Sequence, residues 1–253
     1  MTTMAETTGE LDMGRVIQEL FAMLRRNFAT FAILAVVLVG LPSLLAGYLQ
    51  MSILRQGHLI DWRTVLGQFL PVLGAFILQG TIIYGTVTDL NGRRASVADS
   101  LSVGLNAFPP LLGIGIQSGL AIILGCILLI VPGLMIAVAW CVAVPSYVVE
   151  QPPLLESFGR SADLTRGNRW RIFALFLLYL VVLIIVEAVA GVFGTGARLA
   201  AGGTIPFLQA MVITPLITIA NGMIGATGAA VLYVELRRVR EGVEPAALTT
   251  RFG

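Results

Sequence analysis

The sequence predicts an all-α integral membrane protein with six transmembrane helices, arranged as three hairpins that are each preceded by an amphipathic helix on the cytoplasmic surface. Three observations lead to this fold class. Apolar residues make up 57% of the chain and charged residues only 12%, whereas soluble proteins contain about 45–50% and about 25%. Apolar stretches between the charged residues are long enough for transmembrane helices, which need about 20 residues. An amphipathic segment recurs before the first, third and fifth stretch, which indicates a three-fold internal repeat.

The gaps between charged residues position the elements of one polytopic domain, residues 1–253. The six spans are expected at about 29–50, 65–88, 109–131, 134–149, 172–193 and 206–234. The domain is expected to comprise a flexible N-terminus (1–12), repeat units at about 13–90, 95–150 and 153–236, and a cytoplasmic tail (237–253). Val131-Pro132-Gly133 is expected to form the turn between the third and fourth spans, because proline lacks an N–H and glycine permits a reversal. Pro215 is expected to kink the sixth span.

The placement of arginine predicts the orientation. The chain has 16 basic residues, all of them arginine, and six spans put all but three of them on the side of the two termini. The three exceptions are Arg55, Arg63 and Arg198. Because cytoplasmic loops carry an excess of arginine and lysine, both termini are expected to be cytoplasmic.

The three amphipathic segments have apolar residues at helical spacing. The first stripe consists of Ile17, Leu20, Phe21, Leu24 and Phe28, the second of Val97, Leu101, Leu105 and Phe108, and the third centres on Leu154, Leu155 and Phe158. Such helices lie in the headgroup plane of a membrane with the apolar stripe toward the lipid. They either cover the cytoplasmic ends of the spans or contact lipid directly.

The segment from Glu156 to Arg171 is the most distinctive in the chain. Glu156 and Arg160 have the spacing of an i,i+4 ion pair, Gly167 suits a helix C-cap, and Trp170 suits a membrane interface. This pattern is typical of a helix end followed by interfacial anchors. It also suits a site for an anionic lipid headgroup, since hydroxyls and guanidinium groups bind phosphate. The candidate headgroup residues are Ser161, Thr165, Arg166, Arg169, Arg171 and, near the C-terminus, Arg237.

Glu187 is the one acidic residue well inside a predicted span. An ionisable group at that depth is a functional candidate, because burying a charge in lipid is costly. Asn221 in the sixth span and Arg198 are its candidate partners, and reaching the outer surface is the third possibility. A proton or ion relay and a hydrogen-bonded structural role both fit the sequence.

The remaining residues offer little chemistry. His58 is the only histidine, and Cys126 and Cys141 lie in apolar runs, where small buried side chains are expected. We therefore expect no catalytic residues, no cofactor and no metal site. A net charge of +2 does not favour nucleic acid as a partner. Glycine-rich faces at Gly115–Gly119 and at Gly222, Gly225 and Gly228 suggest packing within the monomer or a contact in a homo-oligomer.

Two motifs resemble a known family. Ser161, Leu164, Thr165, Arg166 and Gly167 form one motif, and Tyr233, Glu235, Leu236 and Arg237 form the other. This pattern resembles the bacterial glycerophosphoryl diester phosphodiesterase membrane-domain family, which implies a six-span protein of the bacterial cytoplasmic (inner) membrane. In the members that give the family its name, the membrane domain is joined to a separate catalytic barrel. No barrel is evident here, so the resemblance implies no enzymatic activity.

Three functions are compatible with these features. The leading hypothesis is a non-enzymatic inner-membrane protein that binds or organises lipids, or assists in handling envelope lipids. The alternatives are a transporter of a small solute, an ion or a proton that uses Glu187, and a membrane scaffold that recruits a protein partner.

Overall fold

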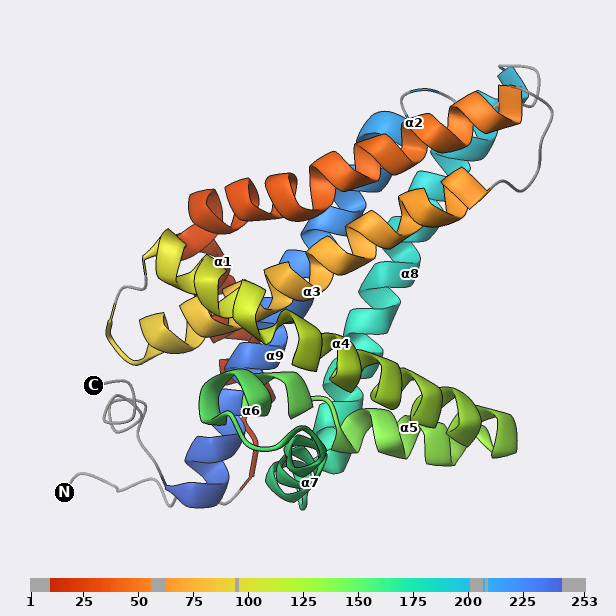
Figure 1. Cartoon of the computed structure of the whole chain (residues 1–253). Helices are drawn as coiled ribbons and strands as arrows, with labels where there is room; N and C mark the ends of the chain where they lie inside the picture. The colour runs from red at the N-terminus through yellow and green to blue at the C-terminus, as the bar shows by residue number, and fades with distance from the viewer. Residues whose placement is uncertain (1–9, 56–61, 94–95, 201–206, 208, 243–253) are drawn as a thin grey trace.

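The structure is a computed structural model that describes residues 10–55, 62–93, 96–200, 207 and 209–242 (Figure 1). Every regular element in this part of the chain is a helix, and six helical stretches are long and apolar enough to cross a membrane. The predicted class of a multi-pass helical membrane protein is thus confirmed at this level. His58 and most of the C-terminal tail lie outside the described residues.

The first hairpin consists of α1 (Met13–Ala35), a π-helical segment (Val36–Gly40), α2 (Leu41–Arg55) and α3 (Trp62–Leu90). Asp12 caps the start of α1 by accepting a hydrogen bond from the Arg15 amide at 3.1 Å. The amphipathic segment continues directly into the first span. Helix α3 approaches the π-helical segment so closely that a Cβ on Gly74 would lie 1.7 Å from the Leu38 carbonyl oxygen.

The second hairpin consists of α4 (Val97–Leu128) and the two short helices α5 (Ile130–Ala139) and α6 (Ala143–Glu150). The predicted turn at residues 131–133 is wrong: the chain reverses at Leu129, which has an extended backbone with φ −163°. Pro132 instead lies in the first turn of α5, where a helix does not need its missing N–H. Gly133 packs against α4, because a Cβ there would lie 2.2 Å from the Cys126 sulfur.

The last third of the chain begins with α7 (Leu154–Thr165), a helix separate from the following span, and continues with α8 (Arg169–Ala200). Gly167 has φ +88° just after α7, in agreement with its predicted capping role. A π-helical segment (Gln209–Ile213) leads into α9 (Thr214–Glu241), and Pro215 lies in the first turn of α9. Residues 237–241, expected in the tail, still belong to this helix.

The core lies where α9 meets α1, α3 and α6. Tyr233 and Leu236 on α9, Ile83 on α3 and Val142 before α6 are fully buried there. Helix α8 lies at the periphery, with most of its aliphatic side chains exposed. In a membrane protein, such exposed aliphatic surface faces lipid.

The apolar stripes on α1 and α4 are partly exposed and partly packed against the protein. On α1, Phe21 and Phe28 are exposed, whereas Val16 and Met23 are buried. On α4, the stripe residues Val97 and Leu105 are exposed, and small residues of the other face are buried instead, namely Ser100, Gly104 and Ala107. Helices in membranes pack through small residues and leave larger apolar residues to the lipid, so periodicity alone does not identify the buried face.

Candidate functional site

Helix α7 is attached to the break between α5 and α6 by hydroxyl groups. The Ser161 hydroxyl donates to the Ala139 carbonyl at 2.8 Å and accepts from the Val142 amide at 3.2 Å. The Thr165 hydroxyl donates to the Ser161 carbonyl at 3.0 Å. Ser161 and Thr165 are both fully buried. These two candidate headgroup residues therefore direct their hydroxyls at the protein backbone and not at the surface.

A charged network joins α6, α7 and α9. The Arg160 Nε donates to both oxygens of Glu150, at 3.1 and 2.8 Å, and the Arg160 guanidinium also pairs with Glu241. The Tyr233 hydroxyl donates to Glu150 at 2.7 Å, and the Arg237 Nε donates to Glu241 at 2.8 Å. We call these five residues the α6–α7–α9 network.

The network has no net formal charge, because two carboxylates face two guanidinium groups. Partial burial lowers the pKa of Arg160, but the hydrogen bonds and charges of Glu150 and Glu241 raise it more, so the pKa lies above its ordinary value. Arg237, a candidate headgroup residue, is thus engaged inside the protein. Tyr233, Arg237 and Glu241 are spaced four residues apart in the sequence, and this spacing could have predicted that they share one face of α9.

The predicted ion pair between Glu156 and Arg160 is wrong, since Arg160 pairs with Glu150 and Glu241 instead. The i,i+4 geometry on an exposed helix is worth only a few tenths of a kcal/mol. Two partly buried carboxylates from neighbouring helices stabilise the Arg160 guanidinium more than the exposed carboxylate of Glu156 would. Only the tertiary fold brings them together.

Arg171 holds the segment that precedes α1. Its guanidinium donates to the Leu11 carbonyl at 2.8 Å and pairs with Glu10. The Leu11 amide donates to the side-chain oxygen of Asn168 at 2.8 Å, and Leu11 is fully buried. Residues 10 and 11, which were expected to be flexible, are therefore docked, and Arg171 is occupied by this contact.

The remaining candidates lie between Arg166, the C-cap of α7, and the start of α8. Arg166 is 70% exposed and pairs with Asp163 at 3.3 Å. The Nε of Arg169 is buried and has no hydrogen-bond partner in the described part of the chain. Trp170 is 83% exposed. We call Arg166, Arg169 and Trp170 the α8-start patch, and it is the part of the predicted site that remains open to a ligand.

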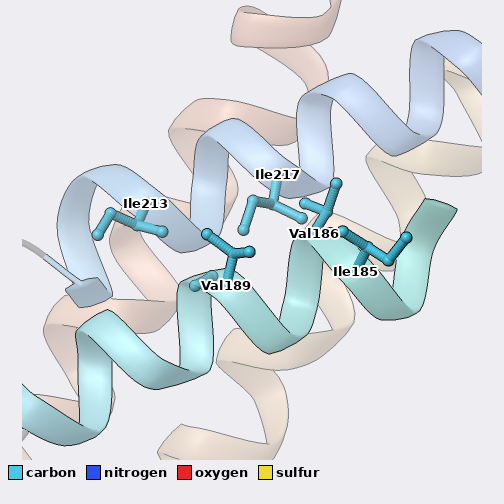
Figure 2. A pocket seen from close by; sticks show the side chains of 6 residues that line it. Ile185, Val186, Val189, Ile213 and Ile217 are labelled. Atoms are coloured by element: carbon cyan, nitrogen blue, oxygen red, sulfur yellow. The ribbon is translucent and has the colours of Figure 1, made fainter.

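Glu187 and Asn221 are not brought together. Glu187 is exposed on α8 and makes no ion pair or hydrogen bond with another described residue, and the side chain of Arg198 lies outside the described residues. The backbone carbonyl of Asn221 accepts a hydrogen bond from the Tyr179 hydroxyl at 3.4 Å. Side chains of α8, the π-helical segment Gln209–Ile213 and α9 instead line an open apolar pocket of about 380 Å³, shown in Figure 2. Its lining is entirely aliphatic: Ile185, Val186, Val189, Ala190, Ile213 and Ile217.

The glycine-rich faces pack mainly within the monomer. A Cβ on Gly115 would lie 2.5 Å from the Phe76 ring, and one on Gly228 would lie 3.1 Å from Leu20. A Cβ on Gly119 would meet nothing within 4 Å. Cys126, which was expected to be buried, is exposed near the end of α4.

Comparisons of the chain with protein family models, curated proteins and solved structures find no match. The family resemblance therefore depends on the quoted motif residues alone.

Proposed function

We propose that this protein is a non-enzymatic inner-membrane protein that binds anionic lipid headgroups at the α8-start patch and thereby organises or helps to handle envelope lipids. The observation that carries the proposal is the exposure of a basic and an aromatic side chain at the α7–α8 junction, Arg166 at 70% and Trp170 at 83%.

The neighbours of Arg169 suit a phosphate headgroup. A guanidinium group can donate two parallel hydrogen bonds to phosphate, and the Arg166 side chain, three residues before Arg169 in the chain, is exposed. Trp170 is exposed directly at the start of the span, where tryptophan prefers the headgroup level of a membrane. Each arginine near an anionic leaflet contributes about 1 kcal/mol.

The proposal includes an orientation. We place the chain in a bacterial inner membrane with both termini cytoplasmic, which the arginine distribution supports. Helix α7 and the first parts of α1 and α4 then serve as the surface helices of three related units. The exposed Phe21 and Phe28 on α1 support this assignment, because they present aromatic side chains to the bilayer.

Mass spectrometry of lipids retained after purification in a mild detergent tests the function. The variant is Arg166→Ala/Arg169→Ala, which spares Arg171 because that residue holds Leu11. The control is Arg25→Ala/Arg93→Ala, which removes the same charge from two exposed positions outside α7 and α8. Removal of two arginines at about 1 kcal/mol each predicts a roughly 30-fold loss of affinity for anionic lipid.

The expected result is selective retention of an anionic phospholipid by the wild type and the control variant, with loss in the patch variant. Equal retention in all three proteins, or retention that follows the bulk lipid composition, would contradict the proposal.

A further inference from the structure

The return leg of the second hairpin is long enough to cross a membrane only if Ile130–Glu150 is counted as one continuous helix, and it is divided into α5 and α6. Helix α5 contains ten residues, and at 1.5 Å per residue it is about 15 Å long. The hydrocarbon core of a bilayer is about 30 Å thick. The chain breaks again at residues 140–142, and α6 then packs against α3 and α9 in the core. Helix α5 alone therefore covers about half of the core.

The C-terminal end of α5 is held at the polar side of the bundle. Ser161 on α7 binds both sides of the break, at the Ala139 carbonyl and the Val142 amide. The exposed face of α7 carries Glu156 and Asp163, so α7 lies at an aqueous surface. Because α5 rises about 1.5 Å per residue, the reversal at Leu129 lies at most about 16 Å from this level, no deeper than about the middle of the core.

The composition of the hairpin tip fits hydrocarbon and not water. Every residue from 119 to 139 lacks a charged, hydroxyl or amide side chain. Ile127, Leu128, Leu129, Ile130 and Val131 are 65–79% exposed. Turns at an aqueous surface are usually made by glycine, proline, asparagine, aspartate and serine. Five consecutive exposed aliphatic residues require an apolar surrounding.

Two features reduce the number of open backbone groups at the turn. A single residue connects the two helices, and its amide donates to the Gly125 carbonyl at 3.0 Å. Pro132 removes one of the free N–H groups at the start of α5. A Cβ on Gly125 would lie 2.8 Å from the Gly133 Cα, so the two helices pack in close contact.

We propose that the α4–α5 hairpin is re-entrant: it enters the membrane from the α7 side and turns back inside the hydrocarbon, where lipid acyl chains surround its tip. The protein then crosses the membrane four times, through α1–α2, α3, α8 and α9. In Figure 1 the α4–α5 hairpin points in a different direction from α2, α3 and α8. The arginine distribution fits both four and six crossings, because residues 100–149 carry no charge.

Cysteine accessibility distinguishes the two topologies independently of the lipid-headgroup proposal. The test variant is Leu129→Cys in a Cys126→Ala/Cys141→Ala background. Trp62→Cys at the start of α3 is the control for the outer side, and Gly159→Cys, where a side chain meets nothing within 4 Å, is the control for the α7 side. Each variant is treated with a membrane-impermeant maleimide in intact cells, in inverted membrane vesicles and after denaturation in SDS.

A re-entrant hairpin predicts that Leu129→Cys reacts at least about tenfold more slowly than Trp62→Cys in intact cells. It also predicts that Leu129→Cys reacts at least about tenfold more slowly than Gly159→Cys in inverted vesicles, and that it reacts fully in SDS. Labelling from the outer side at the rate of Trp62→Cys would show that the hairpin crosses the membrane and would overturn the proposal. Labelling from inverted vesicles at the rate of Gly159→Cys would overturn it as well, because the tip would then lie in water.

A near-native chain provides the second measurement if Leu129→Cys does not fold. In Cys141→Ala the natural Cys126, exposed and three residues before the tip, carries a fluorescent bimane in reconstituted vesicles. Stronger quenching by lipids brominated deep in the acyl chain than by lipids brominated near the headgroup is expected. The opposite order would place the tip at a headgroup interface and refute the re-entrant hairpin.

Discussion

Removal of the Arg160 guanidinium should destabilise the junction of α6, α7 and α9. In Arg160→Met the side chain keeps much of its length but loses its hydrogen bonds to Glu150 and its ion pair with Glu241. Breaking a buried ion pair costs about 3–5 kcal/mol, whereas breaking an exposed pair costs about 0–1 kcal/mol. The Arg160 side chain is 29% exposed, and Tyr233 and Arg237 continue to serve Glu150. We therefore expect a loss of about 2 kcal/mol.

The assay is unfolding by SDS titration in mixed micelles, followed by far-ultraviolet circular dichroism. Arg166→Met is the matched control, because it makes the same substitution on the same side of the bundle at a residue that is 70% exposed. It is expected to change the unfolding free energy by less than about 1 kcal/mol. A double-mutant cycle with Glu150→Gln should give a coupling energy of at least about 0.5 kcal/mol. Equal losses in the two methionine variants, or no coupling, would refute the reasoning that this network joins the three helices.

Two further substitutions test the packing, each by the same unfolding measurement. Gly104→Ala places a Cβ 2.6 Å from the Ile77 carbonyl oxygen on α3 and should cost about 1–3 kcal/mol, whereas Gly119→Ala on the same helix meets open space and should cost nothing. If both glycines tolerate alanine equally, the close crossing of α3 and α4 is incorrect. Ser161→Ala leaves the Val142 amide without its partner and should cost about 1–3 kcal/mol. Ser102→Ala, which removes an exposed hydroxyl, should stay within about 0.5 kcal/mol, and a similar loss in both serine variants would show that α7 does not depend on its hydroxyl contacts.

The sequence was sufficient for features that depend on local composition. The helical class and the approximate limits of the long apolar helices follow from the cost of leaving backbone groups without hydrogen bonds in lipid, which applies to every apolar stretch of that length. The end of α7 was also predictable, because Gly167 adopts a positive φ that favours glycine. The turn in the second hairpin was predicted a few residues too late in the chain, since Pro132 fits the first turn of a helix as well as it fits a break.

The candidate site was predicted only in part. The α8-start patch remains accessible at Arg166 and Trp170, which agrees with the expectation of an exposed basic and aromatic segment. Ser161 and Thr165, however, have the same hydroxyl chemistry whether they face a headgroup or a backbone carbonyl. Their burial against Ala139 is a contact between separate helices, and the local pattern holds no information about it.

Tertiary structure alone decided which side of each helix faces protein. In water, the apolar face of an amphipathic helix is the buried one, but in a membrane both the lipid and the protein interior are apolar. Leu105 and Gly104 are neighbours on α4, and only the close approach of α3 determines that the glycine is buried and the leucine exposed. The same holds for Arg160, whose partners Glu150 and Glu241 come from two other helices. Composition predicts that this chain enters a membrane as helices, whereas packing between distant segments selects the buried faces and the ion pairs.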